Sequence, residues 1–146
     1  MISTEQVKAK FLHPLARFVT KEAIAQLLKV KLERIREVRC WRYVIHVVGV
    51  GISRFVSYGD IPPILGVEPP TQEDCARWRK RWRKTQQQAP AFWVDFYEGK
   101  FRQCDRVEEL FNWGKLVGKI KHGLLLSQIE FLRNIYCVVK ECIARG

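Results

Sequence analysis

The chain has 146 residues, of which 47% are hydrophobic, enough for one core of ordinary domain size or for two small ones. Lys and Arg number 26 against 15 Asp and Glu, and the net charge of +11 is typical of proteins that bind a polyanion, nucleic acid before an acidic membrane. The longest uncharged stretch, residues 43–53, is too short to cross a bilayer, which takes about 20 apolar residues, and no apolar signal segment begins the chain. We therefore expect a cytoplasmic protein that does not enter a membrane.

Prolines divide the sequence into zones, because proline disfavours helix in the residue before it and cannot donate to a β-ladder. The expected parts are an N-terminal domain of residues 1–66, a basic linker of residues 67–90 and a C-terminal region of residues 91–146. In the first part Ser3 and Gln6 have the spacing of a capping box. The sequence then predicts a supporting helix, kinked or restarted at Pro14, with an apolar stripe of Val7, Phe11, Leu15 and Phe18.

Residues 20–40 have the pattern of two short helices joined by a tight turn. Thr20 is placed to cap the first helix, and Ala25 is small at the point where a second helix must cross. This pattern resembles the helix-turn-helix of bacterial transcription regulators, except that Lys29 stands where a glycine usually adopts the left-handed conformation. The alternative is an ordinary helical hairpin with the same core. The expected inward positions are Ile24, Leu28, Val30, Ile35 and Val38.

From residue 43 on, the pattern changes from helix to strand. The β-forming stretches 43–48 and 55–58 flank a turn that contains Gly49 and Gly51, which predicts a β-hairpin. A hairpin directly after the two helices is similar to the winged-helix version of the helix-turn-helix family, with residues 50–54 at the tip of the wing. The fold class that follows is mainly α with a small β-hairpin: an N-terminal winged helix-turn-helix and a helical C-terminal region.

The resemblance implies that the second helix, residues 31–40, reads the major groove of double-stranded DNA. Lys31 and Arg34 are then candidates to donate to guanine, and other cations pair with phosphates. Glu33 and Glu37 complicate this role, because a carboxylate on the reading face must accept from cytosine, repel phosphate or be neutralised by a neighbouring arginine. The predicted DNA contacts of this part are Lys29, Lys31, Arg34, Arg36, Arg39, Arg42 and Arg54.

The basic linker contains a predicted helix at residues 72–88, preceded by the capping-box pair Thr71 and Asp74. Six of the eight residues from 77 to 84 are cationic, and the other two are tryptophans on one side of the helix. We expect a second nucleic-acid contact here. Alternatively, the two indoles anchor the helix to the core and the cations are only solvated. The cations assigned to this contact are Arg77, Lys80, Arg81 and Lys84.

The C-terminal region shows three helical patterns, which begin at Pro90, at Asp105 with Glu108, and at Ser127 with Glu130. The last pattern has the spacing of a dimer seam, which is also the spacing of an ordinary core face. Because helix-turn-helix proteins commonly bind as two-fold dimers, we expect a homodimer. The residues of this seam are Ile129, Leu132, Tyr136, Val139 and Ile143.

Motifs that carry chemistry are absent. The HEXXH, P-loop, GxSxG and dinucleotide-binding patterns do not occur, and none of the three histidines has a catalytic partner by motif. The five cysteines are odd in number, widely spaced and without a CxxC, so we expect reduced, mostly buried thiols and no metal site. The sequence therefore predicts a protein that is not an enzyme and has no cofactor.

Three functions are compatible with these patterns. The first is sequence-specific binding of double-stranded DNA by a transcription regulator. The second is an RNA-binding or ribonucleoprotein accessory protein, for which the basic helix and the aromatic residues are the platform. The third is a protein-interaction module in which the winged helix docks an acidic partner. Fold alone does not separate these three.

Overall fold

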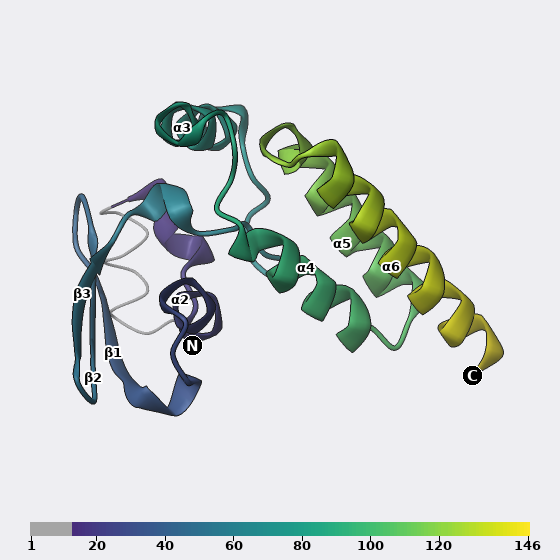
Figure 1. Cartoon of the computed structure of the whole chain (residues 1–146), viewed down its shortest axis with the longest axis horizontal. Helices are drawn as coiled ribbons and strands as arrows, with labels where there is room; N and C mark the ends of the chain where they lie inside the picture. Colours follow the sequence, from purple (N-terminus) through teal and green to yellow (C-terminus); the bar gives the residue numbers. More distant parts are fainter. Residues whose placement is uncertain (1–12) are drawn as a thin grey trace. The chain divides into compact units, whose positions relative to one another are not determined.

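The computed structural model describes residues 13–146, and the chain divides into two compact units, Met1–Pro62 and Pro63–Gly146 (Figure 1). The described residues are mainly helical, with a small antiparallel sheet in the first unit. The expected class is therefore confirmed at this level. The predicted capping box of Ser3 and Gln6, and the helix positions Val7 and Phe11, lie outside the described residues.

The described part of the first unit begins with a short 3-10 helix, η1 (Pro14–Phe18). Nδ1 of His13 accepts a hydrogen bond from the backbone N–H of Leu15 at 3.0 Å, and the His13 ring stacks on Tyr58 with 4.0 Å between centroids. Pro14 is the first residue of η1, where its fixed φ suits a helical start, so of the two roles expected for it, Pro14 starts a helix. Leu15 and Phe18 are buried, as the predicted stripe requires.

Helix α2 (Lys21–Leu28) begins at the predicted cap. Oγ1 of Thr20 accepts a hydrogen bond from the backbone N–H of Ala23 at 3.1 Å. The helix ends at Lys29, which adopts the left-handed conformation with φ 59°. This is the position where the helix-turn-helix pattern usually has a glycine. Ala25 is 6% exposed and so belongs to the core. The first predicted helix and its turn are confirmed.

The predicted second helix at residues 31–40 is wrong. After a 3-10 turn, η2 (Leu32–Arg34), the chain enters a three-stranded antiparallel sheet. Its strands are β1 (Ile35–Cys40), β2 (Ile45–Gly49) and β3 (Ile52–Val56), in the order β1-β2-β3. The expected hairpin is present as β2 and β3, but without a second helix residues 20–40 do not form a helix-turn-helix.

A β-bulge explains why β1 resembles a helix in sequence. Ile35 and Glu37 pair with successive residues of β2, so Arg36 between them is one extra residue in β1. Such a residue shifts the alternation of side chains by one, and therefore Ile35 and Val38, three apart, point to the same face of the sheet. A spacing of three is also the spacing of a helix stripe.

The sheet has one covered and one open face. Helix α2 lies along one side, and on the other side Figure 1 shows no helix of residues 13–62. Ile45 and Val47 on β2 are completely buried, while His46 between them points to the open face. The buried side chains of the covered face are Ile35, Ile45, Val47, Ile52 and Val56.

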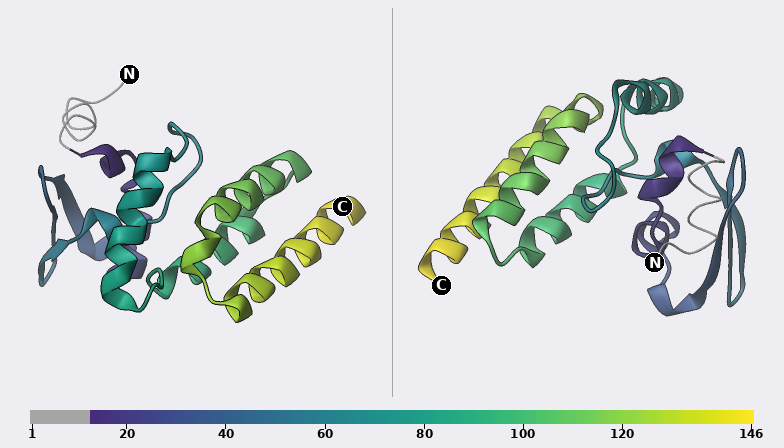
Figure 2. Two further views of the ribbon diagram at one scale, coloured as in Figure 1. Left: turned by 90° about the horizontal axis from the view of Figure 1, so that it is seen from above. Right: turned by 180° about the vertical axis from the view of Figure 1, so that it is seen from behind.

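The described second unit contains four α-helices, of which the last three pack as a bundle (Figure 2). The helices are α3 (Gln72–Trp82), α4 (Phe92–Gln103), α5 (Val107–Ile120) and α6 (Leu126–Arg145). No helix in the part of the chain that the structure describes combines the length and apolarity needed to cross a membrane. The three predicted C-terminal helices are confirmed.

Two of these helices begin at other caps than expected. Helix α5 starts after Arg106, not at a cap formed by Asp105. Helix α6 starts after Leu125, whose backbone N–H donates to Oε1 of Gln128 at 2.8 Å, so the predicted cap at Ser127 is wrong. Of the five predicted seam residues, Leu132 and Val139 are buried within this unit. The homodimer stays a prediction.

Helix α3 is anchored by its tryptophans. The predicted capping box is present, since Thr71 Oγ1 accepts from the Asp74 N–H at 3.1 Å and the Asp74 carboxylate accepts from the Thr71 N–H at 3.0 Å. Trp78 and Trp82 are 0% and 4% exposed, and both meet Trp93 edge-on at 6.0 and 5.8 Å. The indoles are therefore core residues. The helix ends at residue 82, not at 88 as predicted.

All five cysteines are free thiols, but the expectation that most are buried is wrong. Cys104 is buried, and burial raises the pKa of its thiol. Cys40 and Cys75 are half-buried, and burial likewise raises the pKa of Cys75. Cys137 and Cys142 are exposed on α6. Their reactivity toward a thiol reagent should therefore differ strongly.

Candidate nucleic-acid interface

The cations predicted to read a duplex do not lie on one helix. Lys31 precedes η2, Arg34 ends it, and Arg36 is the extra residue of the bulge in β1. All three are exposed. Nε and Nη2 of Arg34 donate to the carbonyl oxygen of Val50 at 3.3 and 2.9 Å, so this side chain holds the β2–β3 turn. A helix at residues 31–40 that could enter a major groove is not present.

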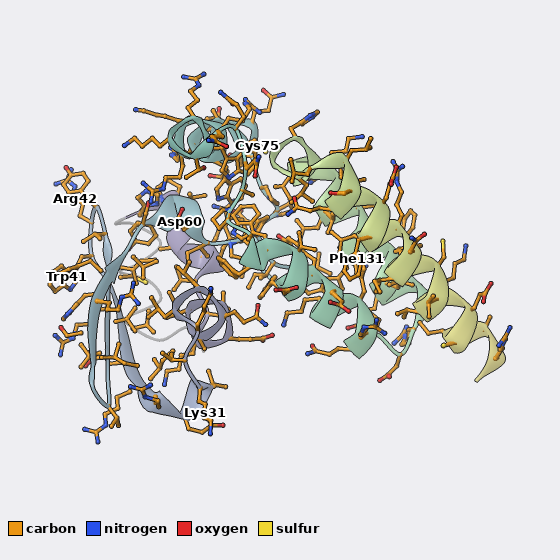
Figure 3. All side chains as sticks on the ribbon, viewed as in Figure 1. Lys31, Trp41, Arg42, Asp60, Cys75 and Phe131 are labelled. Carbon is orange, nitrogen blue, oxygen red and sulfur yellow. The ribbon has the colours of Figure 1, made fainter. Side chains whose placement is uncertain are left out.

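The open face of the sheet carries an aromatic cluster of Trp41, His46 and Phe55. His46 and Phe55 are cross-strand partners, and their ring centroids lie 4.8 Å apart with planes 26° from parallel. The Trp41 ring lies 5.1 Å from that of His46 and 5.7 Å from that of Phe55, between centroids. Figure 3 shows Trp41 pointing away from the sheet on the side opposite to α2. The three rings form one surface.

This cluster is open to solvent. Phe55 is 61% exposed and Trp41 is 44% exposed, and Tyr43 in the β1–β2 loop is 80% exposed. Leaving apolar area in water costs about 25 cal/mol per Å² relative to burial. Large aromatic side chains grouped on a surface therefore make it a candidate binding site.

Cations border the aromatic cluster on β1. Arg39 stands in the same cross-strand row as His46 and Phe55. Its Nε and Nη2 reach the Glu37 carboxylate at 3.0 and 3.1 Å, and this hydrogen-bonded pair lowers the pKa of Glu37 and raises that of Arg39. Glu37, which complicates phosphate binding, is thus partly neutralised by a neighbouring arginine, Arg39.

A second cation lies at the tip of the β1–β2 loop. The Arg42 guanidinium lies 5.3 Å from the centroid of the Tyr43 ring, and Figure 3 places Arg42 at the end of this hairpin. The turn is closed by a hydrogen bond from the Trp41 N–H to the Val44 carbonyl at 3.0 Å. The hydroxyl of Tyr58 also donates to the Trp41 carbonyl, which holds the backbone beneath the cluster.

The other predicted contacts of the first unit lie elsewhere. Arg54 is exposed but shares the covered face of the sheet with Ile52 and Val56, because residues two apart on a strand point the same way. Lys29 ends α2, which also lies on the covered side. Of the cations assigned to this unit, Arg39 stands beside His46 in the sheet, and Arg42 lies over Tyr43 in the loop that follows Trp41.

Helix α3 forms a separate basic surface on the second unit. Arg77 is bound to the buried carboxylate of Asp74 at 3.2 Å, and Arg81 is half-buried. Because both tryptophans of this helix are buried, they cannot stack on bases. The surface offers phosphate contacts without an aromatic platform. Its exposed cations are Arg77, Arg79, Lys80, Arg83 and Lys84.

Reasoning from the sequence missed the aromatic cluster. The alternation of side chains could have located His46 and Phe55, since in the predicted hairpin both lie on the face opposite to the apolar, buried positions. Their pairing depends on the hairpin register, and the position of Trp41 depends on the turn between β1 and β2, whereas the sequence predicted a helix in place of β1. Among residues 13–146 no group of three His, Cys, Asp or Glu side chains is arranged to hold a metal ion.

Comparisons of the chain with protein-family models, with curated proteins and with solved structures gave no match. The site is therefore interpreted from its own geometry. Three stacked or tilted rings on an open sheet, bordered by arginines, can receive flat aromatic groups and phosphates together.

Proposed function

We propose that the first unit binds single-stranded nucleic acid on the open face of its sheet. The aromatic cluster of Trp41, His46 and Phe55 carries the proposal, because an unpaired base can stack on an exposed ring and a base inside a duplex cannot. RNA is the first candidate, since proteins that recognise RNA by sequence mostly bind its single-stranded parts.

The charges near the cluster support the same ligand. Arg39 stands beside His46, and Arg42 lies over Tyr43 in the adjoining loop. A nucleic-acid chain whose bases stack on the cluster would pass its phosphates along these guanidinium groups. Base stacking on an aromatic side chain contributes about 1–3 kcal/mol per base. Phosphate contacts add affinity that falls as the salt concentration rises.

Double-stranded DNA is a second candidate, and helix α3 favours it. Its exposed cations have no stacking rings beside them, which suits contacts to the phosphates of a duplex. A role in transcription and a homodimer on a two-fold site belong to this candidate. With phosphate contacts alone, α3 would bind duplexes with little preference for sequence.

Fluorescence anisotropy of the full chain separates the two candidates. The ligands are a labelled single-stranded RNA, the same sequence as single-stranded DNA, and the corresponding DNA duplex, each at two salt concentrations. We expect Phe55→Ala and Trp41→Ala to weaken RNA binding by roughly 5- to 150-fold, the equivalent of one lost stacking contact. Phe131→Ala, which removes a 41% exposed ring from α6, is the matched control.

Unchanged RNA affinity in both sheet variants would contradict the stacking site. The second candidate would instead be supported if the parent chain preferred the duplex, the double variant Lys80→Glu/Lys84→Glu lost that preference, and Phe55→Ala kept it. Far-ultraviolet circular dichroism of every variant checks that an effect on binding is not an effect on folding.

A further inference from the structure

An open groove runs between α5 and α6 in the second unit. It encloses about 500 Å³, within the range of known ligand sites, and the buried ring of Phe101 on α4 contributes to its lining. Its walls are mostly apolar and include Phe111 and Val117 on α5 and Ile129 on α6.

Two glycines of α5 shape this groove. A Cβ atom on Gly114 would lie 2.9 Å from the Tyr136 ring, so the absence of a side chain lets the two helices approach here. Gly118 is one turn further along α5, and a Cβ atom there would meet no heavy atom within 4 Å. The groove is open at Gly118 because nothing of the second unit fills the space.

The rim of the groove carries an exposed aromatic side chain. Phe111 is 54% exposed, and the ammonium group of Lys115 lies 5.5 Å from the centroid of its ring. Aromatic residues of this kind contribute most of the binding energy at protein interfaces, where a partner completes their burial.

The charged groups of the groove have one sign. Lys115 on α5, Lys121 directly after α5 and Arg133 on α6 line it, and no Asp or Glu does. An occupant that complements this site is apolar on one side and acidic beside it. A second copy docked groove to groove fits poorly, because it would bring the same three cations against their equivalents.

The length of the groove suits a helix. Its lining extends over residues 111–121, along α5 and the residue after it, and over residues 129–137 of α6. These stretches measure about 15 and 12 Å at 1.5 Å per residue, or between two and three helical turns. We propose that the α5/α6 groove binds an acidic amphipathic helix of another protein. Apolar side chains at positions i, i+3 or i+4, and i+7 enter the groove, and flanking carboxylates pair with the three cations.

The test uses the full chain and a labelled synthetic helix with leucines at positions i, i+4, i+7 and i+11 and glutamates beside them. A scrambled peptide of the same composition, without the apolar stripe, controls for charge. We expect the striped peptide to bind at least about tenfold more tightly than the scrambled one, because only the striped peptide can bury its leucines in the groove. Phe55→Ala should leave this binding unchanged, which separates it from the proposed nucleic-acid site.

Two substitutions in the groove test where the peptide binds. Gly118→Leu fills the groove, and Gly99→Leu on α4, where a Cβ also meets nothing within 4 Å, is the matched control. Arg133→Glu reverses a charge of the lining, and Lys119→Glu on α5, outside the lining, is its control. We expect each groove variant to weaken peptide binding at least about tenfold, as loss of a central contact does, and each control to bind as the parent chain does.

Several results would overturn the proposal. They are equal affinity for both peptides, no saturable binding of either, or groove variants that bind as tightly as their controls. Sedimentation of the chain alone tests the second copy as occupant, since a dimer that Gly118→Leu dissociates would replace the acidic helix. Binding to anionic lipid vesicles that Gly118→Leu abolishes would assign the groove to lipid.

Discussion

Arg34 and Val50 bind each other in both directions. Nε and Nη2 of Arg34 donate to the Val50 carbonyl oxygen at 3.3 and 2.9 Å, and the Val50 N–H donates to the Arg34 carbonyl at 2.9 Å. Three hydrogen bonds thus connect the end of η2 to the turn between β2 and β3. An arginine that the sequence assigned to base recognition instead holds the sheet to the segment that precedes it.

Arg34→Ala should therefore reduce stability. Losing two exposed side-chain hydrogen bonds costs about 1 kcal/mol in the free energy of unfolding. Urea unfolding measures this change, and Arg36→Ala, at the extra residue of the bulge, is the control with little expected effect. If Arg34→Ala unfolds like the parent chain but binds nucleic acid more weakly, the side chain acts on the ligand and not on the turn.

Gly49→Ala should destabilise the first unit by about 3 kcal/mol or more, at the upper end of overpacking effects. A Cβ atom at Gly49 would lie 2.0 Å from the Arg34 carbonyl oxygen, a backbone atom that cannot rotate away. Gly118→Ala on α5, where a Cβ meets nothing within 4 Å, should instead be neutral or stabilise by up to about 1 kcal/mol. Thermal unfolding of both variants checks the contrast, and a folded, unaltered Gly49→Ala would refute the close approach.

Arg42→Ala should lower the salt dependence of binding to single-stranded RNA. If Arg42 contacts one phosphate, the slope of log affinity against log salt should become less steep by about 0.7. Lys29→Ala, on the covered side of the sheet, serves as the matched control. Equal slopes for Arg42→Ala and the parent chain would mean that the bound RNA does not contact the β1–β2 loop.

Alkylation by iodoacetamide should reach Cys137 and Cys142 first and Cys104 last. The first two thiols are exposed, whereas burial shields Cys104 and raises its pKa above the ordinary value of 9.0, so less reactive thiolate is present at a given pH. Since the folded thiol of Cys104 keeps its proton to higher pH than the unfolded one, its contribution to stability decreases as the pH rises through 9.0. Peptide mass spectrometry after timed labelling gives the order, and early labelling of Cys104 would contradict its burial.

Local signals in the sequence predicted local structure well. Thr20 caps α2, and Thr71 and Asp74 form their capping box, because each of these bonds joins residues only three apart. Periodicity also located the three C-terminal helices. Periodicity could not show which apolar residues of these helices stay exposed. Leu110 is buried and Phe111 is exposed, although both are large apolar residues of α5, because α4 and α6 cover one and not the other.

Features that depend on pairing between distant residues were not predicted. The bulge at Arg36 gives β1 the spacing of a helix, and only the register with β2 reveals it. The aromatic cluster likewise exists because one register places His46 beside Phe55. The helix predicted at residues 31–40 was wrong, so the recognition helix that depended on it is absent, although the excess of positive charge is correctly read from composition.

The arginines at positions 36 and 54 have a consequence for aggregation. In the described sheet β1 and β3 are the edge strands, each with one neighbour, and an unprotected edge is a template onto which another chain can add a strand. The bulge at Arg36 interrupts that template on β1. Arg54 places a charge on the covered face of β3, where a strand added at this edge would have to bury it. We expect these two residues to keep copies of the protein from joining edge to edge into fibrils.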